Sequence, residues 1–146
     1  MNKLIWVALI IPIAIVGIYF GTAFISGMNT EIDTGGVSTN TFYIGDVPMT
    51  GMDGAYLKSV SEITMSDDYK KLGESQDDES QKRQAAIIVE AYKKTPIPSD
   101  ARLISSRNQY IEGFTEVSEG NWEEGTEKIV YGNLMALSYI KEVKGE

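Results

Sequence analysis

Hydrophobic residues in this chain form one long uncharged run, followed by shorter stretches with helical spacing. The run covers residues 4–26, which are 23 residues without a charged side chain. At about 1.5 Å of rise per residue, a helix of that length covers the roughly 30 Å hydrocarbon core of a bilayer. Pro12 lies near its middle and predicts a kink, which spanning helices tolerate. The pattern therefore predicts a transmembrane anchor over residues 1–26, with residues 4–26 in the bilayer.

The charges on either side of this run predict its orientation. Lys3 precedes the run, whereas Glu31 and Asp33 follow it and the first later basic residue is Lys58. The positive-inside rule then leaves the N-terminus in the cytoplasm and the rest of the chain outside the cell membrane. A cleaved signal peptide is the alternative, with Gly21-Thr22-Ala23 as a weak cleavage site. The apolar run is longer than the usual 7 to 15 residues of such peptides, which favours a retained, single-pass anchor.

Small residues on one side of this helix form a candidate self-association face. Gly17 and Gly21 make a GxxxG pair, and Ala14 lies one turn earlier on nearly the same face. Such residues allow two helix backbones to approach closely, so they favour a homodimer through the membrane helix. The alternative is that glycine is simply frequent in spanning helices.

Residues 27–53 differ in composition from the segments on both sides. They are rich in Gly, Thr, Ser and Asn, and Gly35-Gly36 and Val47-Pro48 are turn or breaker signals. Thr41–Ile44 has the composition of a short extended piece, but a strand without a partner is unstable, so we predict a loop there. The segment is predicted to be a flexible stalk.

From residue 54 to residue 146 the spacing of apolar residues becomes helical. Apolar positions three and four apart predict helices over 54–65, 66–73, 85–92, 99–120 and 121–143, the first two of them short. The polar stretch 74–84 is either a loop or a solvated entry into the third of these helices. With the short pieces merged, the fold class predicted is all-α: a transmembrane helix, a stalk and an antiparallel bundle of three to four helices.

Local signals predict where the long helices begin and end. Prolines 96 and 98 stop one helix, and Ser99 or Asp100 caps the next. Gly120 ends that helix, and Asn121 with Glu124 has the pattern of a capping box for the last one. The joint between these two helices is so short that they must form an antiparallel hairpin. The joint also places Trp122 at the hairpin tip, where packing as a lid on the core is favoured over an exposed role.

Four glycines in the last two helical stretches are unusual, because each interior glycine costs about 1 kcal/mol relative to alanine. Gly113 and Gly120 are seven residues apart, as are Gly125 and Gly132. We expect each pair to permit close approach of the neighbouring helix. The alternative is a ligand groove with exposed backbone.

The charge of the chain narrows the classes of partner. With 13 Lys and Arg against 21 Asp and Glu the net charge is −8, and the single basic residue of the anchor leaves −9 on the remainder. An acidic surface repels phosphate backbones, so nucleic-acid binding is not expected. Solubility alone also explains such a charge.

The sequence offers little for catalysis. It contains no His and no Cys, which removes imidazole catalysis, thiolates and the usual zinc ligands. Acidic pairs such as Asp67-Asp68 and Glu123-Glu124 lie at predicted helix starts, where they complement the helix dipole. No window fits an EF-hand or a phosphate-binding loop. We therefore expect no enzyme activity, no cofactor and no metal site.

Residues 66–143 contain several short motifs in a definite order. Tyr69-Lys70-Lys71-Leu72-Gly73-Glu74 is followed by Pro96-x-Pro98 and Tyr110-Ile111-Glu112-Gly113, and then by Gly132-Asn133. This order is similar to that in small, uncharacterised membrane- or lipid-anchored extracytoplasmic helical-bundle proteins of archaea, methanogens especially. The chain departs from lipid-anchored relatives at the anchor, which has no Cys. The resemblance implies the architecture and no mechanism.

These observations predict a non-catalytic, membrane-tethered extracytoplasmic module with a structural or protein-binding role. Candidate partner-binding residues are the aromatic side chains of the last two helices, namely Tyr110, Phe114, Trp122 and Tyr131, which would instead belong to the core if buried. An accessory subunit of a larger membrane complex is one alternative. A small-molecule or divalent-cation-binding ectodomain is the other.

Overall fold

A computed structural model of this chain describes residues 42–44, 47–49, 51–75 and 77–145. Their elements are two strands and five helices: β1 (Phe42–Ile44), β2 (Val47–Met49), α3 (Gly51–Thr64), α4 (Asp67–Glu74), α5 (Asp78–Lys93), α6 (Ala101–Ser118) and α7 (Trp122–Lys144). The all-α class is confirmed for this part of the chain, with five helices where we predicted three or four. The predicted membrane helix and its Ala14, Gly17 and Gly21 lie outside the described residues. None of the described helices combines the length and apolar character needed to cross a membrane.

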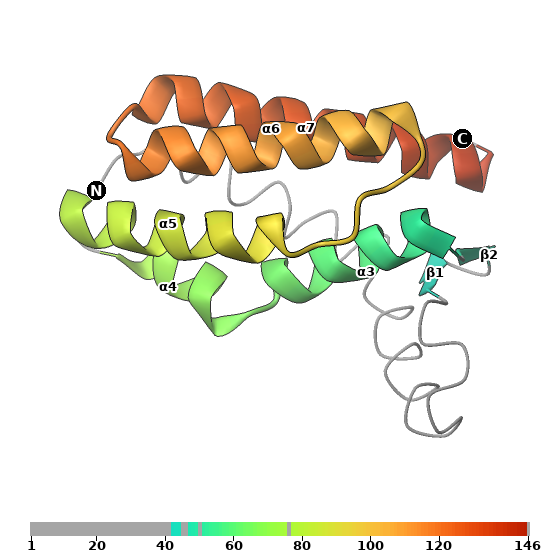
Figure 1. Cartoon of the computed structure of the whole chain (residues 1–146), viewed down its shortest axis with the longest axis horizontal. Helices are drawn as coiled ribbons and strands as arrows, with labels where there is room; N and C mark the ends of the chain where they lie inside the picture. Colours follow the sequence, from blue (N-terminus) through green and yellow to red (C-terminus); the bar gives the residue numbers. More distant parts are fainter. Residues whose placement is uncertain (1–41, 45–46, 50, 76, 146) are drawn as a thin grey trace.

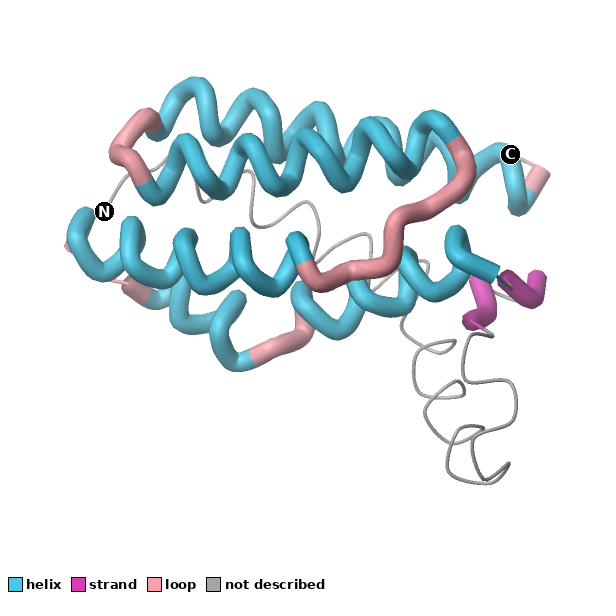
Figure 2. The backbone as a smooth tube through the Cα atoms, viewed as in Figure 1, coloured by secondary structure: helices cyan, strands magenta, loops and turns pink. Residues whose placement is uncertain are grey.

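The helices are arranged around α5 and α6. Figure 1 shows the antiparallel α6–α7 hairpin along one side of α5, with α3 and α4 following one another along the other side. The tube in Figure 2 shows a short turn between α6 and α7 and a longer connection between α5 and α6. The predicted antiparallel hairpin of the last two helices is confirmed.

The helix boundaries follow from local capping. Ser66 Oγ accepts a hydrogen bond from the amide of Tyr69 (3.2 Å), and Asp77 Oδ1 accepts one from the amide of Ser80 (2.8 Å). Asp100 Oδ1 accepts one from the amide of Arg102 (2.8 Å), so Asp100 is the predicted cap of α6. Such caps satisfy amides that have no partner within the helix. The cap at Asp77 also resolves the open stretch 74–84, because α5 begins at Asp78.

The predicted capping box at the start of α7 is wrong. Asn121 precedes the helix but makes no capping hydrogen bond. Its side-chain amide donates instead to Glu116 Oε2 at 2.8 Å, and its backbone amide bonds the Glu116 carbonyl. The tight turn through Gly120, which has a φ of +87°, brings Asn121 back to the end of α6. Gly120 therefore lies in the turn and does not belong to the face of α6 that contains Gly113.

The loop predicted at Thr41–Ile44 is also wrong where the structure describes it. Phe42–Ile44 pairs antiparallel with Val47–Met49, with Phe42 opposite Met49 and Tyr43 opposite Pro48. The end of this hairpin lies directly on α3, because a methyl group added at Gly54 would overlap the carbonyl of Met49. The strand that lacked a partner in the sequence pattern pairs with one that begins five residues further on, at Val47, and Gly54 allows the end of this hairpin to rest on the bundle.

The core between α4, α5 and α6 is built from aromatic rings. The ring of Tyr92 in α5 stacks on Tyr110 and Phe114 of α6, with centroids 4.9 and 5.7 Å apart. The ring of Tyr69 in α4 meets Phe114 edge-on at 6.4 Å. All four side chains are at most 3% exposed. Offset stacking and edge-on contact are the favoured geometries for such rings, so this cluster joins three helices.

The contact between α6 and α7 is built from glycines, as the sequence predicted for Gly113, Gly125 and Gly132. A methyl group added at Gly125 would lie 2.6 Å from Val117 Cγ2 and 2.7 Å from the carbonyl oxygen of Gly113. One added at Gly113 would lie 2.7 Å from Ile129 Cγ1. The two backbones therefore approach each other more closely than any side chain would allow.

Candidate functional site

The four aromatic residues predicted to bind a partner lie at different depths. Tyr110 and Phe114 are 2% and 1% exposed, so of the two roles left open for them the core role applies, and they are not available to a partner. Trp122 is partly buried and packs against the core at the hairpin tip, as predicted for a lid. Tyr131 is 49% exposed on α7 and remains available to a partner.

Exposure divides the apolar residues of α7. Leu134 is 54% exposed, although its spacing in the sequence does not distinguish it from the buried residues of this helix. Ile129, Ala136 and Ile140 are buried. Tyr131 and Leu134 lie three residues apart and therefore share the opposite face of the helix. This face of α7 carries the exposed apolar residues of the hairpin and is the candidate site.

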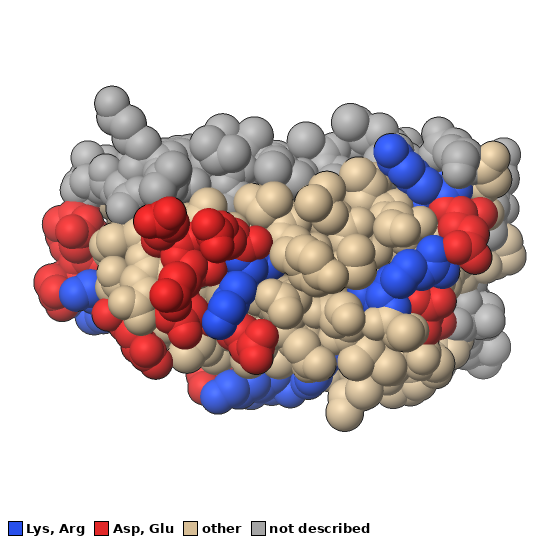
Figure 3. All heavy atoms as spheres, turned by 90° about the horizontal axis from the view of Figure 1, so that it is seen from above, with Lys and Arg blue, Asp and Glu red and all other residues tan. Residues whose placement is uncertain are grey.

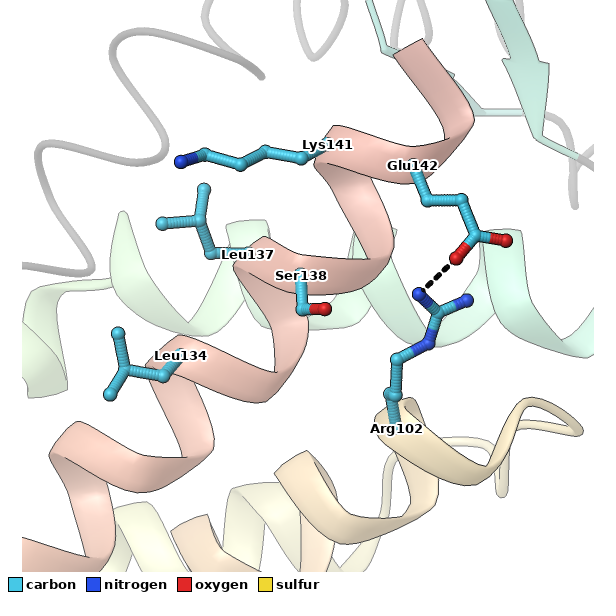
Figure 4. A pocket seen from close by; sticks show the side chains of 6 residues that line it. All are labelled: Arg102, Leu134, Leu137, Ser138, Lys141 and Glu142. Carbon is cyan, nitrogen blue, oxygen red and sulfur yellow. Dashed lines mark hydrogen bonds and ion pairs between the residues drawn. The ribbon is translucent and has the colours of Figure 1, made fainter. Parts of the chain in front are cut away.

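A hollow lies beside these residues. It has a volume of about 570 Å³ and is lined by Arg102, Leu134, Leu137, Ser138, Lys141 and Glu142. Figure 4 shows the two leucines and Lys141 on one side of α7 and the Arg102–Glu142 ion pair on the other, with Ser138 between them. The hollow thus has one apolar side and one polar side, which suits a side chain that is itself apolar with a polar tip.

Arg102 is held in place from several directions. Its guanidinium makes two hydrogen bonds to the Asp100 carboxylate, at 3.1 Å each, and a further one to Glu142. It also lies over the ring of Tyr139, 5.4 Å from the centroid. The bond to Arg102 holds the pKa of Asp100 below its usual range, and burial raises the pKa of Tyr139 to about 12. Asp100 is therefore charged and Tyr139 uncharged at neutral pH.

A second acidic residue ties α3 to the start of α6. Asp53 Oδ1 accepts hydrogen bonds from the backbone amides of Ser99 (2.6 Å) and Asp100 (3.1 Å). The end of the bundle that contains Arg102 is thus braced by carboxylate–amide and carboxylate–guanidinium bonds. The sequence pattern indicated Asp100 as a helix cap but contained no signal for Asp53, which lies 46 residues before Ser99 in the chain.

The buried phenols are held neutral. The hydroxyl of Tyr110 donates to Asn133 Oδ1 at 2.5 Å, and the hydroxyl of Tyr56 bonds Ser106 Oγ at 3.0 Å. Burial raises the pKa of Tyr110 and Tyr56 far above the usual value for a phenol. These bonds connect α6 with α7 and with α3, so they contribute to the packing of the bundle.

The acidic pairs noted in the sequence lie at helix starts. Asp67 and Asp68 are in the first turn of α4, and Glu123 and Glu124 are in the first turn of α7. The amide of Ser80 lowers the pKa of Asp77, which caps α5. Within the part of the chain that the structure describes, no three Asp or Glu side chains come close enough to hold a metal ion.

Comparisons with protein-family models, with curated proteins and with solved structures give no match to this chain.

Proposed function

We propose that this chain is a non-catalytic, single-pass membrane protein whose helical bundle lies outside the cytoplasmic membrane and binds a protein partner. The observation that carries the tether is the uncharged run of residues 4–26, with one lysine before it and an acidic chain after it. The bundle begins after this run and contains its own core, so it can be held at a membrane without taking part in it.

The exposed face of α7 supports the binding role. Tyr131 and Leu134 are both about half exposed and lie next to the hollow that contains Arg102 and Leu137. Large apolar side chains beside a charged, partly buried arginine are typical of protein-binding surfaces. The aromatic residues Tyr110 and Phe114 of this hairpin are buried, so its outer surface is where a partner would bind.

The tether is tested by single cysteines, since the natural chain contains none. Ile87→Cys changes a side chain of α5 that is 43% exposed, and Asn2→Cys is its matched control on the other side of the predicted membrane helix. A membrane-impermeant maleimide added to intact spheroplasts is expected to label the cysteine at position 87. The one at position 2 is expected to react only after the membrane is opened.

Carbonate extraction of the membranes and measurement of the intact mass of the chain complete this experiment. The chain is expected to stay with membranes after washing with alkaline carbonate, and its intact mass is expected to include residues 1–26. Release by carbonate, or protection of position 87 in intact spheroplasts, would reject the proposed tether. A mature chain that lacks the first two dozen residues would instead identify a secreted protein.

A further inference from the structure

The outer face of α7 has a regular repeat of exposed positions. Glu124, Glu127, Tyr131, Leu134, Ser138 and Lys141 are all exposed and follow one another at alternating intervals of three and four residues. This is the spacing of the a and d positions of a coiled coil, which lie along one seam of a helix. We call these six residues the α7 outer stripe.

Charge along the α7 outer stripe changes sign from one end to the other. The stripe is acidic at its start, with Glu124 and Glu127, and basic at its end, with Lys141. Tyr131 and Leu134 lie between the two. Figure 3 shows this side of the hairpin from above: most acidic side chains in the view gather at the α6–α7 turn, and a broad area without charge separates them from the other end. Among the described residues, neither Glu127 nor Lys141 makes an ion pair within the chain.

The outer face of α7 is complementary to itself when it is reversed about Leu134. In that register Leu134 meets its own copy, and Glu127 meets Lys141. Tyr131 meets Leu137, which lies beside the stripe, and Ser138 meets Val130. The next turn brings Glu124 next to the exposed Lys144. A two-fold interface requires that each such contact occur twice, once from each subunit, and this pattern satisfies the requirement. A parallel arrangement would instead place Glu127 against Glu127 and Lys141 against Lys141, which is unfavourable.

We propose that the partner of the α7 outer stripe is a second copy of this chain, packed antiparallel to the first through α7. The inference rests on the proposed binding role of the hairpin surface, but it does not depend on the membrane helix or on its glycines. Charge complementarity identifies the partner as a second copy. The charges of α7, taken in the reverse direction, complement those of the α7 outer stripe, and an unrelated helix is not expected to carry charges in that order.

The hollow beside Leu134 supports the same register. Reversal about Leu134 brings Tyr131 of the second copy to Leu137 and Ser138, which line the hollow. A tyrosine ring fits against Leu134 and Leu137, and its hydroxyl would lie toward the polar side formed by Arg102 and Glu142. Each subunit would fill the hollow of the other.

Chain length allows both copies to be tethered to one membrane. In an antiparallel dimer the two subunits begin at opposite ends of α7, which is about 34 Å long at 1.5 Å per residue. The fifteen residues 27–41 reach at most about 50 Å when extended. Both anchors can therefore enter the same bilayer.

Cysteine cross-linking of the full chain in membranes tests the dimer and its direction. Leu134→Cys places one cysteine at the two-fold axis, where helices 8 to 10 Å apart bring the two copies within reach of a short bis-maleimide. Glu124→Cys is exposed on the same stripe, but an antiparallel pair holds its two copies roughly 30 Å apart along the helix. Glu90→Cys on α5 is the control for random collision. We expect cross-linked dimers from position 134 alone.

Charge reversal tests whether the partner is a second copy. In the Leu134→Cys background, Glu127→Lys and Lys141→Glu each convert two attractive pairs of the dimer into two repulsive ones. Each variant alone is expected to lower the cross-linked yield by about tenfold or more. Mixing the two variants, or combining both changes in one chain, is expected to restore it. Circular dichroism checks that these exposed substitutions leave the helices intact.

Each result decides the proposal. Cross-linking at both 124 and 134 identifies a parallel dimer, and no cross-linking at 134 identifies a monomer or another partner; either overturns it. Charge variants that cross-link like the parent, or fail to recover when mixed, also overturn it. Loss of the cross-link from a chain that stays in the membrane rejects the dimer and leaves the tether, whereas release from the membrane with the cross-link intact rejects only the tether.

Discussion

The two sides of α6 pack against their neighbours in opposite ways. Toward α5, Tyr110 and Phe114 stack on Tyr92, so the helices are held apart by rings and joined through them. Toward α7, Gly113 faces Gly125 and Ile129, and the backbones themselves are in contact. One contact is filled with large side chains, and the other depends on the absence of side chains.

This difference determines which kind of substitution destabilises each contact. The aromatic contact buries large apolar surfaces, so it is sensitive to loss of volume, which leaves a cavity. The glycine contact gains van der Waals energy from close approach, so it is sensitive to added volume, which forces the helices apart. A single helix thus has one side that fails when atoms are removed and one side that fails when they are added.

The largest expected effect is at the aromatic contact. Tyr92→Ala removes a ring that contacts two rings of α6, and we expect it to lower the free energy of unfolding by about 4 kcal/mol. Tyr92→Phe keeps the ring and is expected to stay within about 1 kcal/mol of the natural chain. Urea unfolding followed by circular dichroism measures both. If Tyr92→Phe lowered the free energy of unfolding as much as Tyr92→Ala does, the stabilisation would come from the hydroxyl group and not from the ring.

A smaller effect is expected at the glycine contact. Gly113→Ala would place a methyl group 2.7 Å from Ile129 Cγ1 and 2.9 Å from the carbonyl oxygen of Gly125. Strain of about 1–3 kcal/mol should exceed the gain of about 1 kcal/mol in helix propensity, so the variant should be less stable. Asn108→Ala, at an exposed position of the same helix, has the propensity gain without the clash and should be slightly stabilising. Equal stabilisation of the Gly113→Ala and Asn108→Ala variants would contradict this prediction.

The smallest effect is expected at the polar end of α6. Asn caps helices about as well as Asp, so Asp100→Asn isolates the loss of the charge that holds Arg102, worth about 1 kcal/mol at pH 7. The pKa of Asp100 is lowered in the folded chain, so its stabilising effect is complete above the unfolded value near 3.9 and disappears as the pH falls through the folded value. The unfolding midpoints of the two chains should therefore differ at pH 7 and converge near pH 3. A difference that persists in acid would assign the effect to geometry instead of charge.

Much of the bundle was readable from the sequence, because its signals are local. Ser66 and Asp100 cap their helices with hydrogen bonds to amides two or three residues away. Asp77 does the same for α5, although the sequence pattern left residues 74–84 open. Asn121 shows where such reasoning stops. Its sequence context favours a cap, yet a glycine turn brings Glu116 within reach and the side chain bonds there. The contact between Gly54 and Met49 and the bonds of Asp53 to the start of α6 were likewise beyond the pattern, since each depends on how distant segments pack.

The candidate site was predicted only in part. The pattern marked four aromatic residues of the last two helices as candidates, and one of them, Tyr131, is clearly exposed. Leu134 and Lys141 were not marked, although the heptad spacing from Glu124 to Lys141 was present in the sequence. The sequence alone does not separate that spacing from the apolar stripe through Ile129 and Ala136, which runs along the same helix.

The amino-acid sequence alone determined the helical class of the described region, the caps and prolines that delimit its long helices, and the pairing of α6 with α7. These properties depend on a few neighbouring residues and on the length of the joint between two helices. The tertiary structure decided which of two apolar faces of α7 is buried, because burial is a property of what lies opposite. Gly113 and Gly125 draw one face against α6, and that contact leaves Tyr131 and Leu134 on the other.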